Sequence, residues 1–158
     1  MNLFRIYREL RGTLLHPRAG QIERGVRIDR LLVPTPRLLE LGWAHQTIGV
    51  EIKRSGAHIG PALAQALDYV HSVFDLDGLA GVVPTCVFVW PMEKQSGPLA
   101  SLMANMRVGS ASSQHGGVKL AFGEEVLFDS TNYRGVRNVD PLRSAGRSVI
   151  SGRKVGSR

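Results

Sequence analysis

Apolar residues recur at a helix-like spacing in two parts of the chain. Over residues 3–14 they lie at i, i+4, i+7 and i+11, which predicts an amphipathic helix that ends at Pro17 at the latest. The same spacing recurs over residues 61–74, where Pro61 fits the first helical turn. Residues 99–107 are a third, shorter candidate. The pattern therefore predicts three helices.

Short runs of branched and other apolar residues predict strands between these helices. The expected strands are residues 26–33, 46–54, 85–90, 118–122 and 126–128. The last two would form a hairpin, whereas residues 108–117 are rich in Gly and Ser and are expected to be a loop. A strand–helix–strand unit over residues 46–90 requires a parallel pair of strands, so the predicted fold class is α/β.

Composition adds a strong asymmetry of charge to this outline. The chain has 158 residues and a formal net charge of +7, with ordinary proportions of hydrophobic and charged residues. Residues 1–54 carry +5, residues 55–130 carry −4 and residues 131–158 carry +6. We therefore expect a folded domain over residues 1–129 and a basic, disordered tail over residues 130–158. Two basic regions favour a polyanionic partner.

Cysteine usage and hydropathy narrow the class of protein. Cys86 is the one cysteine of the chain, which excludes an internal disulfide and any site that needs several thiolates. It lies in an apolar run and is expected to be buried and inert. No stretch approaches the ~18 apolar residues that span a bilayer, and arginines interrupt the first ten residues. These features predict a soluble protein of the reducing cytoplasm.

The candidate chemistry lies on two neighbouring predicted strands. Alternation along the second strand puts Glu51 and Lys53 on one face, opposite the face of Val50 and its apolar neighbours. Asp29 lies in the preceding strand among apolar residues, where an unpartnered acid is costly. If the two strands pair, Asp29 and Glu51 share a site, and two such close carboxylates need a cation between them or a proton on one of them. Mg²⁺ is bound in proteins by one or two carboxylates together with substrate phosphates.

Asp29 followed by Glu51-x-Lys53 resembles the catalytic motif of the PD-(D/E)XK nuclease superfamily. Gln65 and Tyr69, on the following helix, resemble the QxxxY motif of its RecB-like branch. Residues 25–74 are also similar to small proteins of actinobacterial phages. Two departures from the family pattern are Ile28, where the motif has proline, and the long interval between Asp29 and Glu51.

The resemblance implies a restriction-endonuclease-like core, in which helices flank a mixed central sheet in the order α-β-β-α-β with a C-terminal hairpin. It implies hydrolysis of DNA in phage recombination, replication or repair, by an exonuclease or by a junction- or structure-specific endonuclease. The catalytic residues it implies are Asp29, Glu51, Lys53, Gln65 and Tyr69. The ligands it implies for Mg²⁺ or Mn²⁺ are Asp29, Glu51, the carbonyl of Ile52 and a further acid, Glu9 or its competitor Glu23. The phosphate-binding residues would be Arg27, Arg30, Arg54, Arg134 and Arg137.

Each of these residues also has an ordinary structural interpretation. Glu51 and Lys53 are typical of an exposed ion pair on a strand, and Asp29 is close in sequence to arginines that can pair with it. Gln65 and Tyr69 fit a solvated helix face. The alternative function is a non-catalytic DNA-binding protein on the same fold, in which the tail supplies affinity. A homodimer is a further possibility, because symmetric cleavage of two strands needs two sites.

Overall fold

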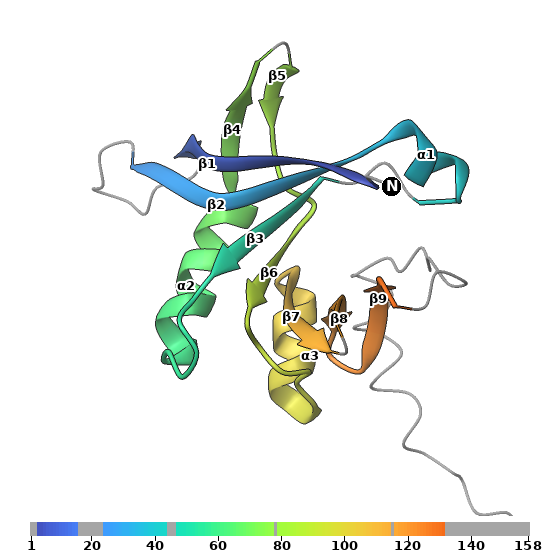
Figure 1. Cartoon of the computed structure of the whole chain (residues 1–158). Helices are drawn as coiled ribbons and strands as arrows, with labels where there is room; N and C mark the ends of the chain where they lie inside the picture. The colour runs from blue at the N-terminus through green and yellow to red at the C-terminus, as the bar shows by residue number, and fades with distance from the viewer. Residues whose placement is uncertain (1–2, 16–23, 44–46, 78, 115, 132–158) are drawn as a thin grey trace, which may run out of the picture.

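The computed structural model describes residues 3–15, 24–43, 47–77, 79–114 and 116–131. Its strands are β1 (Phe4–Leu14), β2 (Gly25–Pro34), β3 (Ile48–Ile52), β4 (Ser72–Leu76), β5 (Leu79–Val82), β6 (Cys86–Trp90), β7 (Val108–Gln114), β8 (Gly117–Phe122) and β9 (Glu125–Asp129). Its helices are α1 (Pro36–Glu40), α2 (Ile59–Val70) and α3 (Gly97–Asn105). The strands form one mixed sheet in the order β5-β4-β1-β2-β3-β6-β7-β8-β9 (Figure 1). The α/β class is confirmed, although strands outnumber helices.

The helix expected over residues 3–14 is wrong, because this segment is the strand β1. It pairs antiparallel with β2 along nearly its whole length. The helix-like spacing has a backbone cause: Glu9 has a φ of 49°, in the left-handed region, which interrupts the regular alternation of a strand. Tyr7 and Leu10, three residues apart, therefore pack on the same hydrophobic cluster. An irregular strand thus imitates the period of a helix.

The parallel pair predicted at the centre of the chain is confirmed. β3 and β6 run parallel from the Ile48–Cys86 pair to the Ile52–Trp90 pair, and α2 lies between them in the sequence. The helix is shorter than expected, since it ends at Val70 and Phe74 belongs to β4. The next residues leave the helix because their backbone pairs with the end of β1.

The Gly- and Ser-rich segment expected to be a loop is β7, which is a second correction. Its backbone pairs with β6 on one side and with β8 on the other. Small residues suit this position: a Cβ on Gly109 would lie 2.4 Å from the Phe88 ring and 2.6 Å from the Ala121 carbonyl oxygen. Composition alone suggested a mobile segment, whereas close packing explains the small side chains. The predicted hairpin of β8 and β9 is confirmed.

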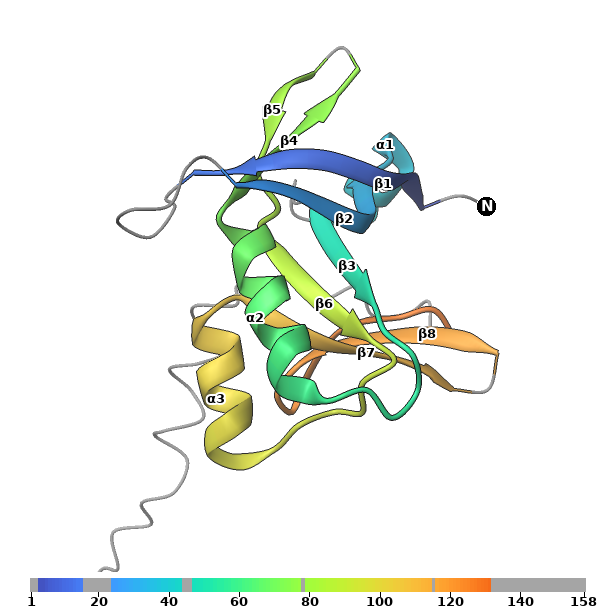
Figure 2. The ribbon, with the colours of Figure 1, turned by 90° about the vertical axis from the view of Figure 1, so that its left-hand side faces the viewer.

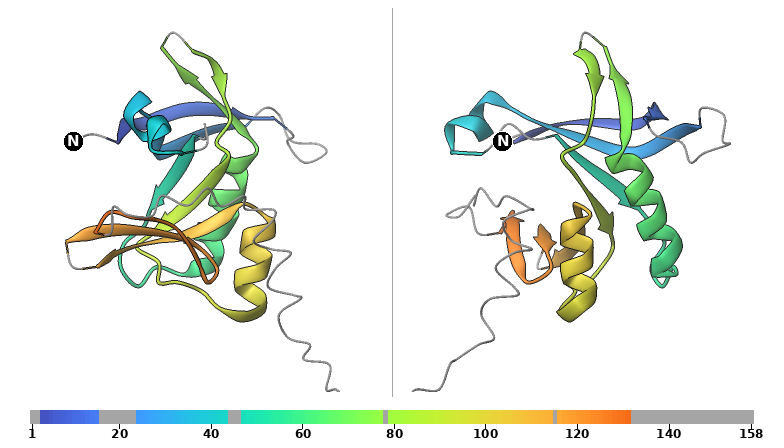
Figure 3. Two further views of the ribbon diagram at one scale, coloured as in Figure 1. Left: turned by 90° about the vertical axis from the view of Figure 1, so that its right-hand side faces the viewer. Right: turned by 180° about the vertical axis from the view of Figure 1, so that it is seen from behind.

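Two hydrophobic clusters lie on the two sides of the sheet. On one side, α2 packs on β3 and β6, and α3 packs on β7 and β8 (Figure 2). On the other side the sheet curls, so that Phe4 in β1 and Phe128 in β9 stack edge to face with ring centroids 5.9 Å apart. The strands β7, β8 and β9 lie below β1 and β2 in both views of Figure 3. The curl buries the second cluster between distant strands of one sheet.

Two further expectations concern burial and the membrane. Cys86 is fully buried, as predicted, and burial raises the pKa of its thiol to about 12, so the thiol stays protonated. None of the helices in the described part of the chain has the length and apolar composition that crossing a bilayer requires. The tail proposed for residues 130–158 lies outside the described residues from position 132 onwards.

Gly49 tests the close packing of β3 against its neighbours. A Cβ at this position would lie 2.7 Å from Ile28 Cδ1 and 2.9 Å from Val87 Cγ2. We expect Gly49→Ala to lower the free energy of unfolding by about 1–3 kcal/mol, because both neighbours must shift. The matched control is Gly25→Ala in β2, where the added Cβ meets nothing within 4 Å. Urea denaturation of both variants measures the difference, and equal stabilities would contradict the packing of β3.

Candidate active site around Glu51

Glu51 is the one carboxylate among the buried residues of the described chain. It lies in β3 on the face covered by α2, and only 2% of its surface is exposed. Its Oε1 atom lies 2.5 Å from the ammonium of Lys53. Its Oε2 atom is buried and has no hydrogen-bond partner among the described residues. A buried carboxylate oxygen without a partner is costly, so this position needs a functional explanation.

A chain of hydrogen bonds joins Lys53 to the helix. The Lys53 ammonium donates to Gln65 Oε1 at 2.6 Å, and the Gln65 amide donates to the Tyr69 hydroxyl at 2.6 Å. The Tyr69 hydroxyl donates in turn to the carbonyl oxygen of Arg27 at 2.6 Å. The chain therefore connects β3, α2 and β2 and fixes the position of the lysine.

Asp29 stands where the backbone ladder between β2 and β3 ends. The last paired residues are Arg30 and Val50. One residue further, Asp29 Oδ2 accepts a hydrogen bond from the backbone N–H of Ile52 at 2.7 Å. The Asp29 side chain thus replaces a ladder bond, and its carboxylate is held beside the end of β3. The structure brings Asp29, Glu51 and Lys53 together.

The electrostatics of Glu51 follow from its surroundings. Burial raises the pKa of Glu51 above its ordinary value, and the negative charge of Asp29 raises it further. The interactions with Lys53 and, to a smaller extent, with the nearby Tyr69 hydroxyl oppose this rise in the pKa of Glu51. Burial and the charge of Glu51 also raise the pKa of Tyr69 well above its usual range, so its hydroxyl remains a hydrogen-bond donor. Keeping both carboxylates charged at this site costs free energy, and a bound cation would remove that cost.

The face of α2 that carries Gln65 and Tyr69 differs from the expected one. The sequence suggested that both residues leave the core together, but Tyr69 is 98% buried and only its hydroxyl meets the polar network. The buried residues of the helix are Ala62, Ala66, Tyr69 and Val70. The two alanines allow the helix backbone to approach the sheet closely. Ala62 and Ala66 are four residues apart and lie on the same side of the helix as Tyr69. This spacing of small residues is the sequence pattern that indicates the buried face.

Glu9, the candidate for a further acid, is not part of the cluster. It lies in β1 between Arg8 and Leu10, whose partners Arg30 and Ile28 flank Asp29, but its side chain is exposed. Within the described ranges there is no group of three or more His, Cys, Asp or Glu that could hold a metal ion. Any metal site built from these residues therefore uses Asp29 and Glu51 with backbone oxygens. Glu23 lies outside the described residues.

Three of the five proposed phosphate-binding arginines are described, and each is next to a residue of this site in the chain or contacts one. Arg27 supplies the carbonyl that accepts from Tyr69, and Arg30 donates to the Asp29 carbonyl oxygen at 2.6 Å. Arg54 is exposed directly after Lys53. Arg134 and Arg137 lie outside the described residues.

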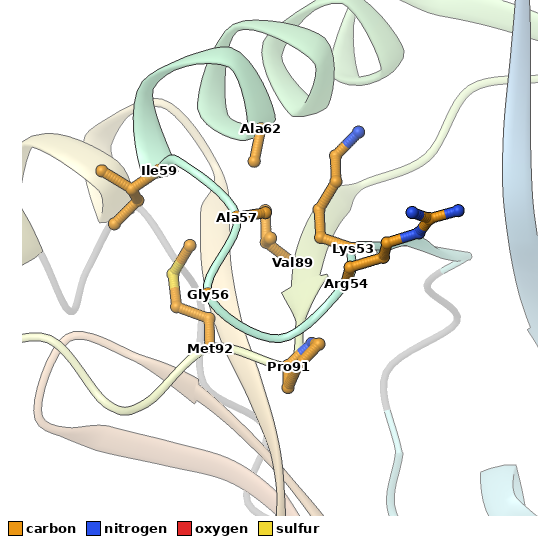
Figure 4. A pocket seen from close by; sticks show the side chains of 9 residues that line it. All are labelled: Lys53, Arg54, Gly56, Ala57, Ile59, Ala62, Val89, Pro91 and Met92. Carbon is orange, nitrogen blue, oxygen red and sulfur yellow. The ribbon is translucent and has the colours of Figure 1, made fainter.

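A small pocket of about 100 Å³ adjoins Lys53. It lies between the loop that follows β3, the first turns of α2 and the end of β6, with Ala62 and Val89 at its centre (Figure 4). Lys53 and Arg54 stand together on one side of it, and Ile59 lies on the other. The pocket thus combines a small apolar surface with two cationic side chains, Lys53 and Arg54.

Comparisons of the chain with protein-family models, with curated proteins and with solved structures gave no match. The arguments for function therefore come from the residues themselves.

The buried carboxylate makes stability depend on pH in a definite direction. Because the pKa of Glu51 is raised in the folded protein, the folded state binds more protons than the unfolded chain between the ordinary value of 4.5 and the raised value. Stability therefore falls as pH rises through this window. We expect Glu51→Gln to raise the melting temperature above the window, and the gain to vanish below pH 4.5.

Thermal denaturation from pH 4 to pH 8 in EDTA measures this difference. Asp75→Asn is the control, because Asp75 is an exposed acid in β4. A lower melting temperature for Glu51→Gln at neutral pH would show that the charged carboxylate stabilises the fold.

Proposed function

We propose that the protein is a metal-dependent nuclease that hydrolyses phosphodiester bonds of DNA. The observation that carries the proposal is the buried Glu51 carboxylate, with Oε2 unpartnered among the described residues and with Asp29 and Lys53 beside it. Structural ion pairs are usually exposed and fully partnered. A carboxylate that is buried from solvent next to a second carboxylate is typical of a site that binds a cation or exchanges a proton.

The residues fit a divalent metal ion. Asp29 and Glu51 offer carboxylate oxygens, and the carbonyl of Ile52 would be the backbone ligand. Oxygen ligands of this kind suit Mg²⁺ or Mn²⁺. When bound, such an ion lowers the pKa of a coordinated water and stabilises negative charge on the phosphate. A positive ion here would also provide the missing partner of Glu51 Oε2.

The side chains of the chain itself would divide the remaining work. Lys53 is held by Gln65, so its ammonium is positioned to orient an attacking water and to neutralise charge on the phosphate. Tyr69 holds Gln65 through its hydroxyl and is a positioning residue. Arg27, Arg30 and Arg54 are close to the acids and would bind neighbouring phosphates.

The proposal includes the finer features that the resemblance implies. The core would be restriction-endonuclease-like, with β2, β3 and β6 as its central strands and α2 as the helix that carries Gln65 and Tyr69. The proposed location is the cytoplasm, which is the host cytoplasm if a phage encodes the protein. Cleavage of two strands at one site would require a homodimer, whereas exonuclease action would not.

One observation favours a second function, a DNA-binding protein without catalysis. The Lys53 ammonium is already engaged by both Glu51 and Gln65. These contacts can serve to hold α2 on the sheet. This protein would bind DNA with a steep dependence on salt and would not cleave it.

Isosteric variants of the two acids test catalysis. Single-stranded, duplex and branched DNA is incubated with the full-length protein in Mg²⁺ or Mn²⁺. We expect cleavage by the wild type and by the control Asp75→Asn, and background cleavage by Asp29→Asn and Glu51→Gln, because either change removes a charged metal ligand. Cleavage that persists in both acid variants would remove these residues from the mechanism.

Metal binding is measured independently of cleavage. Mn²⁺ at about 100 times its Kd stabilises a folded protein by about 2.7 kcal/mol, so it should raise the melting temperature of the wild type. The rise should be absent in a variant that combines Asp29→Asn with Glu51→Gln. Equal rises in both proteins would show that the metal binds elsewhere. DNA binding without cleavage and without this rise would favour the second function.

A further inference from the structure

The two longest strands bring four arginines into directly opposed pairs. The register of β1 with β2 pairs Arg8 with Arg30 and Arg11 with Arg27. Directly opposed residues of antiparallel strands share a face, and their Cβ atoms lie about 5 Å apart. Like charges in this position destabilise a sheet. The sequence nevertheless places arginine at all four positions.

No described carboxylate forms an ion pair with these four arginines, although the exposed Glu9 lies between Arg8 and Arg11 in β1. The ion pairs among the described residues are Arg24 with Asp68 and Glu51 with Lys53. Arg30 makes one hydrogen bond, to the carbonyl oxygen of Asp29. Arg8, Arg11 and Arg27 are exposed. Four arginines against one exposed acid leave a cationic surface, which an anionic ligand with several charges explains most simply.

Both arginine pairs lie on one side of the two strands. Ile28 and Leu31, three residues apart in β2, are fully buried in the cluster beneath α2. Alternation is therefore offset at Asp29, opposite the left-handed Glu9, and the residues before and after this point can face the same way. Arg27, which directly precedes the buried Ile28, pairs with Arg11. Arg30, which directly precedes the buried Leu31, pairs with Arg8. The arginines thus occupy the face turned away from α2.

The spacing of the pairs fits a linear chain of phosphates. Three residues of a strand cover about 10 Å, so the two pairs can contact different phosphates of one extended backbone. Asp29 lies between Arg27 and Arg30 in β2, so the arginines flank one of the candidate acids. Guanidinium groups bind phosphate with paired donors, which favours arginine over lysine at such positions.

We propose that Arg8, Arg11, Arg27 and Arg30 form an arginine ridge that binds the sugar–phosphate backbone of a nucleic acid across β1 and β2. The ridge goes beyond the proposed function, because it lies on the face of the sheet turned away from α2, whereas Glu51 lies on the face that α2 covers. It also adds Arg8 and Arg11, which sequence analysis did not assign to any function.

The test measures binding of full-length protein to fluorescein-labelled 20-nucleotide single-stranded DNA and RNA by anisotropy, across a range of salt in EDTA. The ridge variant is Arg8→Gln with Arg11→Gln. The control variant removes the same amount of charge elsewhere. It combines Arg5→Gln in β1, where Arg5 is opposite Val33 of β2, with Arg37→Gln in α1. We expect the ridge variant to bind about tenfold more weakly at 0.1 M salt, with a salt slope lower by about 1.4 for two lost contacts.

A second variant separates binding from folding. Arg8→Glu with Arg11→Glu creates opposite-charge pairs with Arg30 and Arg27, so we expect an unchanged or higher melting temperature together with weaker binding. Loss of affinity for DNA alone or RNA alone identifies the nucleic acid that the ridge holds, and either result supports it. Equal losses in the ridge and control variants, or no loss in either, would overturn the proposal. Because EDTA prevents cleavage, this outcome is independent of whether the protein is a nuclease.

Discussion

The burial of the Glu51 carboxylate is the constraint around which this part of the molecule is organised. A charged group in this position must be neutralised by the protein, by a proton or by a ligand. The protein supplies Lys53 for one oxygen, and it leaves the other oxygen unpartnered among the described residues. Asp29 adds negative charge to the same place. Stability alone would favour an apolar residue here, so the arrangement is best understood through function.

The polar network and the hydrophobic core are coupled through α2. The same helix that buries Ala62, Ala66 and Val70 carries Gln65, which holds the lysine. Tyr69 belongs to both, because its ring is buried against Phe74 and its hydroxyl completes the chain of hydrogen bonds. The position of the lysine therefore depends on how closely the helix packs on the sheet. Small side chains at the contact are as important to the site as the polar ones.

An irregularity of the sheet organises the surroundings of Asp29. The left-handed Glu9 in β1 and the end of the β2–β3 ladder coincide at this level. Beyond the end of this ladder the backbone N–H of Ile52 donates to the Asp29 carboxylate, and the arginine pairs of β1 and β2 lie on either side of the same level. Backbone distortions of this kind are costly and are concentrated at functional sites. The placement of the acid and the exposed charges next to it thus coincide with one irregular level of the sheet.

Local sequence determined the identity of the elements wherever one pattern dominated. The alternation around Glu51, the helix that carries Gln65 and the terminal hairpin were all predictable, because burial on one face imposes a regular period. Tertiary pairing decided the segments that were misread: β1 has the spacing of a helix, β7 has the composition of a loop, and residues 72–74, expected in the helix, pair with β1. Only the tertiary structure placed Tyr69 in the core and opposed Arg8 to Arg30, since register and helix approach depend on contacts between residues that are distant in the chain.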